Sequence, residues 1–499
     1  MGIEVLLELP AAMCADRAAL VHETETETFA DWWLHSQWAG AGLQSHGARH
    51  VVFLGLNGPA FSTAVFAAAH CGLPIVPLNY RLSDDQLHAL IAAIDAPLVV
   101  VDPEMVDRLP AEVARLTTQE LLQASRTAGE LAAADSGDAA AVVLFTSGTT
   151  SAPKGVLLKH DHLMSYILQT VDPGSAAEDE CALVCVPPYH VAGVASVLSN
   201  AYAGRRVVFL PSFDPAEWLA TVRREKVTSA MVVPTMLARI VEHLAGARAD
   251  VPSLRSISYG GARVAPSVLE QALEAFEHTG FVNAYGLTET SSTIAVLGPE
   301  DHRLAFASDE PLIRMRLSSA GRPVPGIELR ILDEAGLPCG SGVAGALSVR
   351  GPQVSGEYLD SGSSLDADGW FDTRDRASID SDGFLYIEGR TDDTIIRGGE
   401  NIAPSEIESV LLSHPAIADA AVVGLPDEQW GQQIAAVVVA RADQVIDADE
   451  VQQYVRSRLR GSKTPETVAV WVELPYNPLG KLLRRDVLAQ LSATTETGS

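Results

Sequence analysis

The chain has 499 residues, more than one hydrophobic core usually supports, so two or more domains are expected. Its 47% of apolar and 20% of charged residues are ordinary for a globular protein. The formal net charge of −29 argues against nucleic-acid binding, because a phosphate backbone would be repelled. The five cysteines show no zinc-binding spacing and suggest no disulfides, which favours a reducing compartment. Cys181 and Cys185 lie in an apolar run and are predicted to be core residues.

The N-terminus does not predict a targeting segment. Glu4 and Glu8 interrupt its apolar residues and no basic segment precedes them, which is unlike a secretory signal. Leu6 stands where N-myristoylation needs Ser or Thr. No apolar run approaches the roughly 20 residues that cross a bilayer. We therefore expect a soluble, cytoplasmic protein without a membrane span.

Short apolar segments alternate with Ala- and Leu-rich segments in the first part of the chain. The alternation predicts βαβ units and mainly parallel sheets, and it recurs between residues 160 and 300. Ser83 is placed to cap a helix that begins after it. Strands are expected at residues 51–54, 74–78, 97–101 and 140–145, and a helix at residues 59–73.

A loop rich in glycine and hydroxyl groups follows the last of these strands. Residues 146–155 read Thr-Ser-Gly-Thr-Thr-Ser-Ala-Pro-Lys-Gly. Glycine lets backbone N–H groups approach an anion, hydroxyl groups donate hydrogen bonds, and lysine adds a positive charge. A Walker A loop is disfavoured, because Pro153 replaces its second glycine and Gly155 replaces its magnesium-binding hydroxyl. The loop therefore predicts a polyphosphate site of another kind.

The last third of the chain changes character twice. Between residues 320 and 387, short segments with many Gly and Asp predict a small β-rich subdomain. We place a hinge at residues 390–393, because a new helix with Pro404 near its start follows. The predicted fold is α/β, with mainly parallel sheets in an N-terminal domain over residues 1–389 and a small, mobile α+β domain over residues 394–499.

Six further segments resemble motifs of the AMP-forming, adenylate-making superfamily. This superfamily includes acyl-CoA synthetases, luciferases and the adenylation domains of peptide synthetases. The resemblance runs in the family's order from about residue 15 to residue 490. The segments are 187–190 (Pro-Pro-Tyr-His), 259–262 (Tyr-Gly-Gly-Ala), 283–289 (Asn-Ala-Tyr-Gly-Leu-Thr-Glu), 373–375 (Thr-Arg-Asp), 389–393 (Gly-Arg-Thr-Asp-Asp) and 477–481 (Asn-Pro-Leu-Gly-Lys).

The resemblance implies that a carboxylate attacks the α-phosphorus of ATP and pyrophosphate leaves. Negative charge then builds on the phosphoryl oxygens, so cations and donors must face them. By the resemblance, Glu289 is the Mg²⁺ ligand, which suits a hard cation, and Thr288 donates to the α-phosphate. The β- and γ-phosphates would be held by Thr146, Ser147, Gly148, Thr149, Thr150 and Lys154.

The same resemblance assigns the nucleoside. Tyr285 would offer a face to adenine, Asp375 would accept from both ribose hydroxyls, and Arg390 would donate to the ribose or α-phosphate. Two residues depart from the family pattern: Ser151 and Arg374 each replace a glycine, which changes the surroundings of the nucleotide. The base would also approach Gly260, Gly261 and Ala262, and the same cofactor-binding set includes Asn283, Ala284 and Gly286.

Lys481 resembles the lysine that bridges the carboxylate and the α-phosphate during adenylation and is withdrawn for the second step. It follows a predicted turn and precedes an apolar helical face, so it is expected at the rim of the small domain. Asp392 matches the family's hinge position. His190 resembles the histidine beside the carboxylate in the acyl and aryl branch. An amino-acid substrate is disfavoured, because histidine offers the substrate ammonium no fixed negative charge.

The acyl pocket is expected from residues 194–198, 231–235 and 291–296, whose small or apolar side chains favour a hydrophobic chain or ring. Gly398 and Gly399 would suit a loop beside a pantetheine arm. The phosphates of CoA would meet Arg456, Arg458, Arg460 and Lys463, or Arg484 and Arg485, unless these form only a solvated basic face.

We therefore expect an AMP-forming acyl-CoA synthetase that uses ATP, Mg²⁺ and coenzyme A on a small carboxylic acid, as a monomer or homodimer. The first alternative is an acyl-AMP ligase that loads an acyl carrier protein. That branch usually carries an extra insertion for which this chain has no room. A luciferase-like oxygenase would use the same scaffold. A non-catalytic nucleotide-binding relative is disfavoured by the intact Lys154, Glu289, Asp375 and Lys481.

Overall fold

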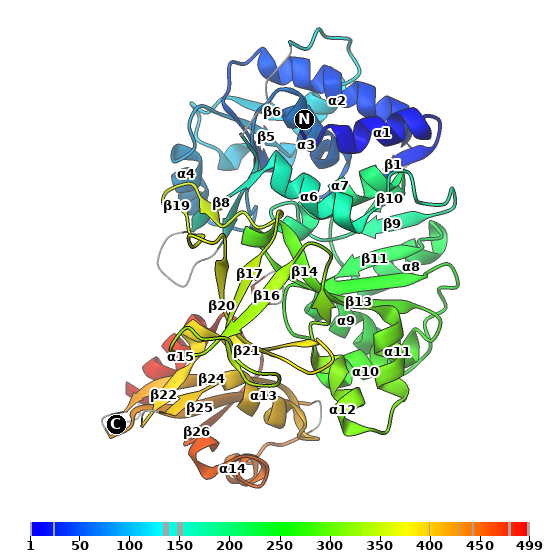
Figure 1. Cartoon of the computed structure of the whole chain (residues 1–499). Coiled ribbons are helices and arrows are strands. Elements are labelled where there is room, and N and C mark those ends of the chain that lie inside the picture. Colours follow the sequence, from blue (N-terminus) through cyan, green and yellow to red (C-terminus); the bar gives the residue numbers. More distant parts are fainter. Residues whose placement is uncertain are drawn as a thin grey trace.

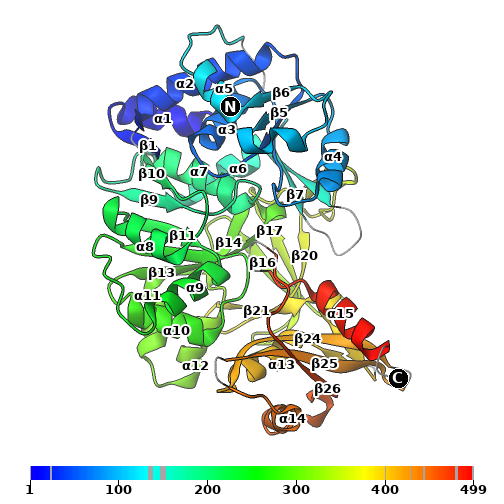
Figure 2. The same cartoon turned by 180° about the vertical axis from the view of Figure 1, so that it is seen from behind.

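A large body of sheets and covering helices carries a smaller C-terminal body at one end (Figures 1 and 2). The expected fold class is confirmed: the chain is α/β, with a small separate α+β unit at its C-terminal end. The computed structural model describes residues 2–22, 25–132, 139–146, 153–398, 400–427, 429–441, 444–477 and 481–496.

An eight-stranded sheet forms the part of the large body nearest the N-terminus. Its centre is parallel, and Val51 pairs with both Ile75 and Leu98 on neighbouring strands. The hairpin that holds the phosphate loop is antiparallel, with Thr146 opposite Lys154. In spatial order the strands are β19 (Gly362–Ser363), β18 (Glu357–Tyr358), β8 (Lys154–Lys159), β7 (Ala140–Thr146), β4 (Ile75–Pro77), β3 (His50–Leu54), β5 (Pro97–Val101) and β6 (Arg115–Thr117).

A nine-stranded sheet lies beside it. From β13 through β12, β11, β9 and β10 to β1 the pairing is parallel, and the outer strands are antiparallel. Cys181 and Cys185 are buried here, as predicted for core residues. In spatial order the strands are β15 (Arg322–Pro323), β14 (Ser292–Leu297), β13 (Gly280–Leu287), β12 (Ser256–Gly260), β11 (Ser229–Val232), β9 (Cys181–Val184), β10 (Arg206–Phe209), β1 (Ala18–His22) and β2 (Glu25–Thr28).

The two large sheets share one hydrophobic core, which includes Phe53, Val207 and Phe281. Ser83 caps α4 as predicted, because its hydroxyl accepts from the backbone N–H of Gln86. The covering helices are α1 (Val5–Met13), α2 (Phe29–Gln44), α3 (Pro59–His70), α4 (Asp84–Ala92), α5 (Thr118–Ala124), α6 (His160–Thr170), α7 (Val191–Ala203), α8 (Pro215–Arg224), α9 (Pro234–Leu244), α10 (Pro266–Ala275), α11 (Pro299–Ala307) and α12 (Pro311–Arg314), with short 3₁₀ turns η1 (Pro103–Arg108), η2 (Thr288–Thr290) and η3 (Met315–Ser318).

The predicted β-rich subdomain is a four-stranded antiparallel sheet. Its strands are β16 (Glu328–Leu332), β17 (Gly345–Arg350), β20 (Phe371–Ile379) and β21 (Leu385–Arg390). Arg390 is the last residue of β21 and pairs with Asp375 on β20. This pairing places Arg390 inside the sheet, one residue before the turn η4 (Thr391–Asp393).

The C-terminal unit has its own core on both faces of a three-stranded sheet. Ile407 and Val438 are buried on one face, and Val437 and Val487 on the other. Its elements are the hairpin β22 (Ile395–Arg397) and β23 (Glu400–Ile402), then α13 (Pro404–Leu412), β24 (Ile417–Asp427), β25 (Gly431–Ala440), α14 (Ala448–Arg456), η5 (Gly461–Lys463), β26 (Thr467–Trp471) and α15 (Arg484–Glu496).

A membrane-spanning helix must be both long and apolar. No helix in the described part of the chain combines the length and the apolar character that a membrane span requires.

Candidate active site

Several predicted site residues lie where neighbouring strands of the nine-stranded sheet end. Gly260 closes β12, and the segment from Asn283 to Leu287 forms the end of β13. These strands are parallel, so their carboxyl ends share one edge of the sheet, where α/β proteins commonly bind ligands. The turn η2, which carries Thr288 and Glu289, follows β13 directly.

Asp375 is held by two partners that the sequence also predicted. The Tyr285 hydroxyl donates to Asp375 Oδ2 at 2.5 Å, and Arg390 Nη1 donates to Asp375 Oδ1 at 3.3 Å. Burial raises the pKa of Asp375, while Arg390 and the Tyr285 hydrogen bond act to lower it. Burial and the Asp375 charge raise the pKa of Tyr285, so its phenol stays protonated. One buried carboxylate thus joins β13, β20 and β21.

Glu289 has a partner that sequence reasoning missed. The Tyr358 hydroxyl donates to Glu289 Oε1 at 3.0 Å, and Lys154 Nζ lies 5.7 Å from the centre of the Tyr358 ring. Burial, followed by the negative charge of Glu289, raises the pKa of Tyr358. No described residue donates to Glu289 Oε2. Nothing in the sequence signals this pair, because 69 residues separate the two side chains.

Lys481, from the C-terminal unit, lies near enough to Asp375 and Glu289 for their charges to act on it. Its backbone is fixed by two hydrogen bonds with Asn477, each 2.8 Å long. The side chain keeps solvent contact, yet the protein around it lowers its pKa. Burial is the largest cause, and the positive charge of Arg390 adds to it. The charges of Asp393, Asp375 and Glu289 act in the opposite direction.

The glycines of the adenine segments serve different purposes. A side chain on Gly260 would place its Cβ 2.2 Å from the Ala284 carbonyl oxygen, and one on Gly286 would place it 1.8 Å from that of Ser292. Strand pairing alone therefore requires glycine at both positions. Gly261 has φ +84° and open space before it, so it can leave room for a base.

Two other adenine-segment residues have defined places. Asn283 Nδ2 donates to the carbonyl oxygen of Ser319 at 3.0 Å, which fixes the orientation of the amide. Ala262 lines a cavity together with Asn283, beside the glycines. The two segments therefore meet at one edge of the sheet.

Several predicted residues stand apart from these contacts. Thr288 is half-buried on η2, and its hydroxyl has no hydrogen-bond partner among the described residues. His190 precedes α7, where burial lowers its pKa to about 4 and keeps its imidazole neutral. Asp392 lies in η4, with Arg374 Nη1 3.7 Å from its Oδ2. Ser147, Gly148, Thr149, Thr150 and Ser151 lie outside the described residues.

The donor set suits a magnesium nucleotide. Mg²⁺ is commonly held by one or two carboxylates together with phosphate oxygens, and Glu289 supplies one carboxylate here. Asp375 can accept from ribose hydroxyls. Positive charge comes from Lys154 on β8, Arg390 on β21 and Lys481 in the segment before α15. This combination can bind a polyphosphate ester and stabilise charge that develops on it.

Comparison with known proteins decides the family. The model described as AMP-binding enzyme matches residues 7–359, and the model described as AMP-binding enzyme C-terminal domain matches residues 406–481. The chain belongs to the AMP-binding enzyme family. The predicted superfamily is therefore confirmed, and the second match covers much of the predicted C-terminal domain.

Several AMP-binding enzymes that are similar to this chain are coenzyme A ligases. Feruloyl-CoA synthase from Amycolatopsis sp is 33% identical over 492 residues, covering 96% of each chain. Indoleacetate–CoA ligase from Aromatoleum aromaticum is 32% identical over 476 residues, covering 91% of each chain. The solved o-succinylbenzoate CoA synthetase from Bacillus subtilis, in complex with its acyl-adenylate intermediate, has a TM-score of 0.82 at 30% identity and 97% coverage of each chain. The predicted class, an AMP-forming acid–thiol ligase of the acyl-CoA synthetase branch, is confirmed.

Proposed function

We propose that this enzyme converts an aromatic carboxylic acid to its acyl-adenylate and then to its coenzyme A thioester. The cofactors of the reaction are ATP, Mg²⁺ and coenzyme A. The observation that carries the proposal is the position of Lys481. This residue belongs to the C-terminal unit, yet the negative charges of Asp375 and Glu289 in the large body favour its protonated form. Such a cation, placed on a developing phosphoryl charge, is what adenylation needs.

Each side chain has one task in the first half-reaction. Asp375 accepts from the ribose while Tyr285 and Arg390 hold its carboxylate still. Glu289, oriented by Tyr358, would hold the Mg²⁺ ion, which would supply positive charge to the phosphates. Bound ATP supplies the electrophilic phosphorus and the pyrophosphate leaving group. Lys481 then neutralises charge where the carboxylate oxygen attacks.

His190 and Thr288 have more local tasks. His190 stays neutral through the pH range in which carboxylates are ionised, so it does not compete with Lys481 for the acid as a counter-ion. Its imidazole can still donate one hydrogen bond to a carboxylate. Thr288 offers a hydroxyl beside Glu289 to the α-phosphate.

The aromatic class of acid is supported by the relatives. Feruloyl, indoleacetate and o-succinylbenzoate all carry an aromatic ring, and each names a substrate of a relative. In α7, Val194 and Leu198 are fully buried in the shared core, whereas Ser196 is half-buried. In this segment, the wall of an acyl pocket would therefore be formed by half-buried residues such as Ser196.

The hinge is proposed at residues 390–393. Leu385 packs in the core beneath the four-stranded sheet, and Ile395 packs in the core of the C-terminal unit. The short turn η4, with Asp392 at its centre, is the part of the chain that passes between the two cores. Rotation there would withdraw Lys481 after adenylation and let the C-terminal unit act as a mobile lid.

The acceptor site uses fewer basic residues than the sequence suggested. Lys463 is paired with Glu406 at 2.6 Å, and Arg484 is paired with Glu408 inside the C-terminal unit. Gly398 lies against the Trp430 ring, where a Cβ would come within 3.0 Å, so its small size is explained by this contact. The exposed basic residues left for the phosphates of coenzyme A are Arg456, Arg458, Arg460 and Arg485.

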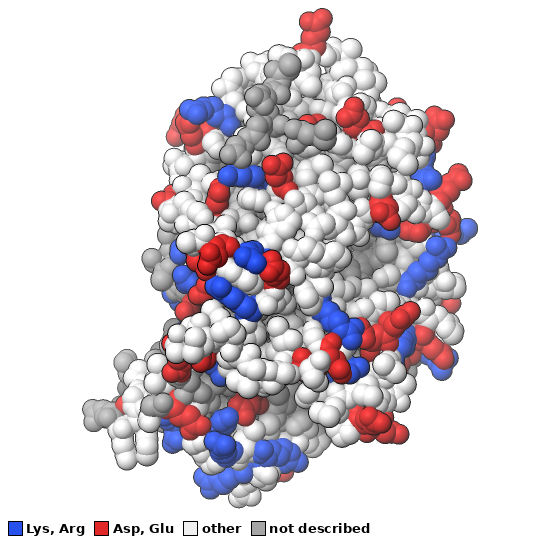
Figure 3. All heavy atoms as spheres, in the orientation of Figure 1, with Lys and Arg blue, Asp and Glu red and all other residues white. Residues whose placement is uncertain are grey.

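The charge distribution agrees with this location. On the face shown in Figure 3, basic side chains are most frequent over the C-terminal elements, while acidic ones are spread over the large body. An anionic acceptor would meet less repulsion there. A carrier protein as acceptor, a monomeric or homodimeric state and a cytoplasmic location stay predictions.

Release of pyrophosphate from a panel of carboxylic acids tests the proposal. With ATP and Mg²⁺, we expect release to depend on aromatic acids such as ferulate, indoleacetate or o-succinylbenzoate and to exceed that with saturated fatty acids. Adding coenzyme A should convert the bound adenylate to a thioester and increase turnover. Acid-independent release would contradict the adenylation, and thioester formation only with a carrier protein would contradict the acceptor.

A further inference from the structure

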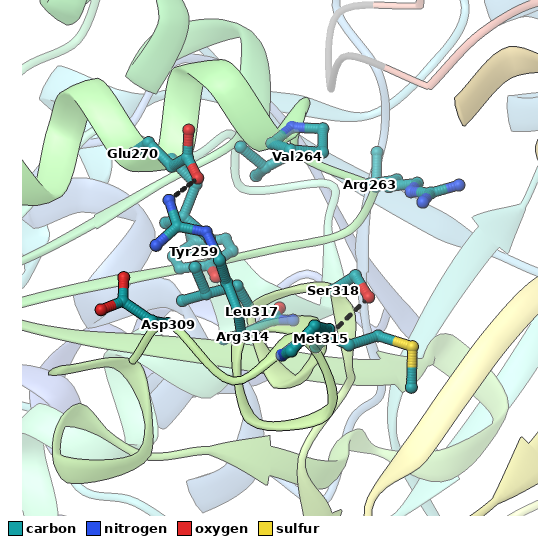
Figure 4. A pocket seen from close by; sticks show the side chains of 14 residues that line it. Tyr259, Arg263, Val264, Glu270, Asp309, Arg314, Met315, Leu317 and Ser318 are labelled. Carbon is teal, nitrogen blue, oxygen red and sulfur yellow. Dashed lines mark hydrogen bonds and ion pairs between the residues drawn. The ribbon is translucent and has the colours of Figure 1, made fainter. Parts of the chain in front are cut away.

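A cavity of about 480 Å³ lies beside the proposed adenine site (Figure 4). Its volume falls within the roughly 300–1,000 Å³ typical of small-molecule sites. Ala262 and Asn283 belong both to this cavity and to the predicted adenine-binding set. Its lining does not include Glu289, Asp375 or Lys481, so it is not the place of the reacting groups.

The orientation of the Asn283 side-chain amide indicates which edge of a bound adenine would face the cavity. Its Nδ2 donates to the Ser319 carbonyl oxygen at 3.0 Å, so its Oδ1 points to the other side of the amide and accepts from no described residue. Adenine presents its exocyclic N6 amino group as a donor, which an asparagine oxygen matches. A base bound here would place its N6 edge against Asn283, which lines the cavity.

The wall beyond this edge is mainly apolar. Val264, Leu269, Met315 and Leu317 line it, together with two prolines. Figure 4 shows Glu270 and Arg314 pointing toward each other, and they form an ion pair. Since these two charges satisfy each other, an apolar group can enter the cavity without leaving either of them unpaired.

The next wall residue, Arg263, turns away from the cavity. Figure 4 shows its side chain extending away from the other labelled residues. Its Nη1 lies 3.4 Å from the carbonyl oxygen of Ser405 in the C-terminal unit. The guanidinium is thus committed to the contact between the two bodies. The charged groups that remain on the lining are the paired Glu270 and Arg314 and the carboxylate of Asp309.

We propose that this cavity receives an apolar substituent carried on N6 of the adenine, so that the enzyme uses N6-alkyl or N6-aryl ATP. The inference rests on the proposed adenylation and names a further class of nucleotide for the same site. The reaction is unchanged in its bonds: a carboxylate oxygen bonds to the α-phosphorus, the bond to the bridging oxygen breaks, and pyrophosphate leaves. The N6 substituent takes no part in these bonds.

The test compares N6-benzyl-ATP with ATP in acid-dependent pyrophosphate release by the full-length enzyme. We expect kcat/KM for N6-benzyl-ATP to stay within about tenfold of that for ATP, since the ring fills an apolar space. Met315→Trp, at an exposed wall position, should reduce the ratio of the two kcat/KM values by about tenfold or more. Leu317→Trp on the same turn should act alike.

Leu312→Trp provides the matched control, because Leu312 is exposed on α12 and does not line the cavity. It should leave the ratio unchanged. The inference is overturned if wild type uses ATP but not N6-benzyl-ATP, or if both wall variants keep the wild-type ratio. Failure of the proposed function looks different, since ATP itself would then support no adenylation. In that case, the affinity for N6-benzyl-AMP would be compared between wild type and Met315→Trp. Equal affinities would overturn the inference separately.

Discussion

The ammonium of Lys481 stands among charges of both signs. Arg390 disfavours its protonated form, whereas Asp393, Asp375 and Glu289 favour it. A nucleotide brings several negative charges into this space, so its binding should strengthen the protonated form further. The lysine thus becomes most effective as a cation when the substrate is present.

Lys481→Ala should abolish the first half-reaction selectively. Loss of one charge-stabilising donor at a developing oxyanion costs about 10²–10³ in rate, and we expect at least this loss in acyl-adenylate formation. Thioester formation from supplied acyl-AMP and coenzyme A should stay near wild type. Stopped assays of each half-reaction measure the rate of acyl-adenylate formation and the rate of thioester formation separately. Lys226→Ala, at an exposed position of the large body, is the control, and equal loss of the two half-reactions would refute the role.

Arg374 shows why a glycine usually precedes the ribose aspartate. Its φ is +59°, a left-handed conformation that costs a side-chain-bearing residue about 1–2 kcal/mol. Its contact with Asp392 joins two exposed side chains and contributes little. The departure noted in the sequence is therefore a local strain next to the site.

Arg374→Gly should leave the protein equally stable or stabilise it by up to about 1 kcal/mol, because the relieved strain exceeds the added chain entropy. Chemical denaturation measures the change. The matched change Arg376→Gly, two residues along the same strand, should instead destabilise by about 1 kcal/mol, since Arg376 has no positive φ that glycine would relieve and glycine adds chain entropy to the unfolded state. A clear loss of stability in Arg374→Gly would argue against the strain.

At the scale of elements, the turn η2, which carries Thr288 and Glu289, is fixed by hydrogen bonds from a neighbouring segment of the chain. Backbone N–H groups of Ser355 and Gly356 donate to the Glu289 carbonyl oxygen at 2.9 and 3.2 Å. Gln353 Nε2 donates to the carbonyl oxygen of Thr290 at 3.0 Å. The segment that leads into β18 therefore holds the backbone of Glu289 and, through Tyr358, its carboxylate, which is the proposed metal ligand.

The C-terminal unit has its own polar anchor beside the hinge. Arg484 at the start of α15 donates to both oxygens of Glu408 on α13, at 2.5 and 2.9 Å, and lies 3.3 Å from Asp393. Burial acts to lower the pKa of Arg484, but Glu408 and Asp393 raise it overall. One guanidinium thus ties the helix after Lys481 to the end of the hinge.

Arg484→Ala should destabilise the C-terminal unit by about 3–5 kcal/mol, because it leaves the buried Glu408 carboxylate unpaired. Denaturant unfolding followed by tryptophan fluorescence measures the loss. Adding Glu408→Gln should recover part of it by removing the buried charge. Arg485→Ala, at the next and exposed position, should change stability by less than about 0.5 kcal/mol. Similar effects of both arginine changes would contradict the anchor.

At the scale of the whole molecule, histidines whose pKa is lowered by burial should make the protein sensitive to acid. Burial lowers the pKa of His70, His190 and His302 to about 4. His302 is completely buried, its Nδ1 donates to the Gly298 carbonyl oxygen, and its Nε2 accepts from the Tyr259 hydroxyl, each at 2.8 Å. Only the neutral ring can make both hydrogen bonds.

Stability should therefore fall as the pH drops from about 6.5 toward 4. The folded pKa of His302, about 4, lies below its ordinary 6.5, so the unfolded chain binds the proton more tightly. Neutral His302 contributes its full stabilisation above pH 6.5, and about 3 kcal/mol of it is lost across this window. Free energies of unfolding measured from pH 7 to 4 test this.

Two histidine variants separate this effect from general acid sensitivity. His302→Gln should flatten the pH dependence by the share of one histidine. His278→Gln, at an exposed position, should leave it as in wild type. An unchanged slope in His302→Gln would show that other groups cause the acid lability.

Much of the fold could be predicted because its signals are local. Ser83 caps α4 through a neighbour three residues away, and the apolar runs at β3, β4 and β5 alternate with helices over short distances. The site motifs were readable for the same reason: the segment from Asn283 to Glu289 and the loop ending at Lys154 keep their chemistry within a few residues. Helix caps, strand periodicity and compact motifs depend on neighbours along the chain.

The amino-acid sequence alone thus determined the family and the two-part α/β architecture, and it predicted most members of the proposed site. Only the tertiary structure revealed Tyr358 as the partner of Glu289, assigned Gly260 and Gly286 to strand packing, and placed Lys481 where the charge of Asp375 acts on it. These facts depend on which distant segments meet when the sheets form and the C-terminal unit docks. Such contacts follow from burial and packing across the whole chain, which no single stretch of residues encodes.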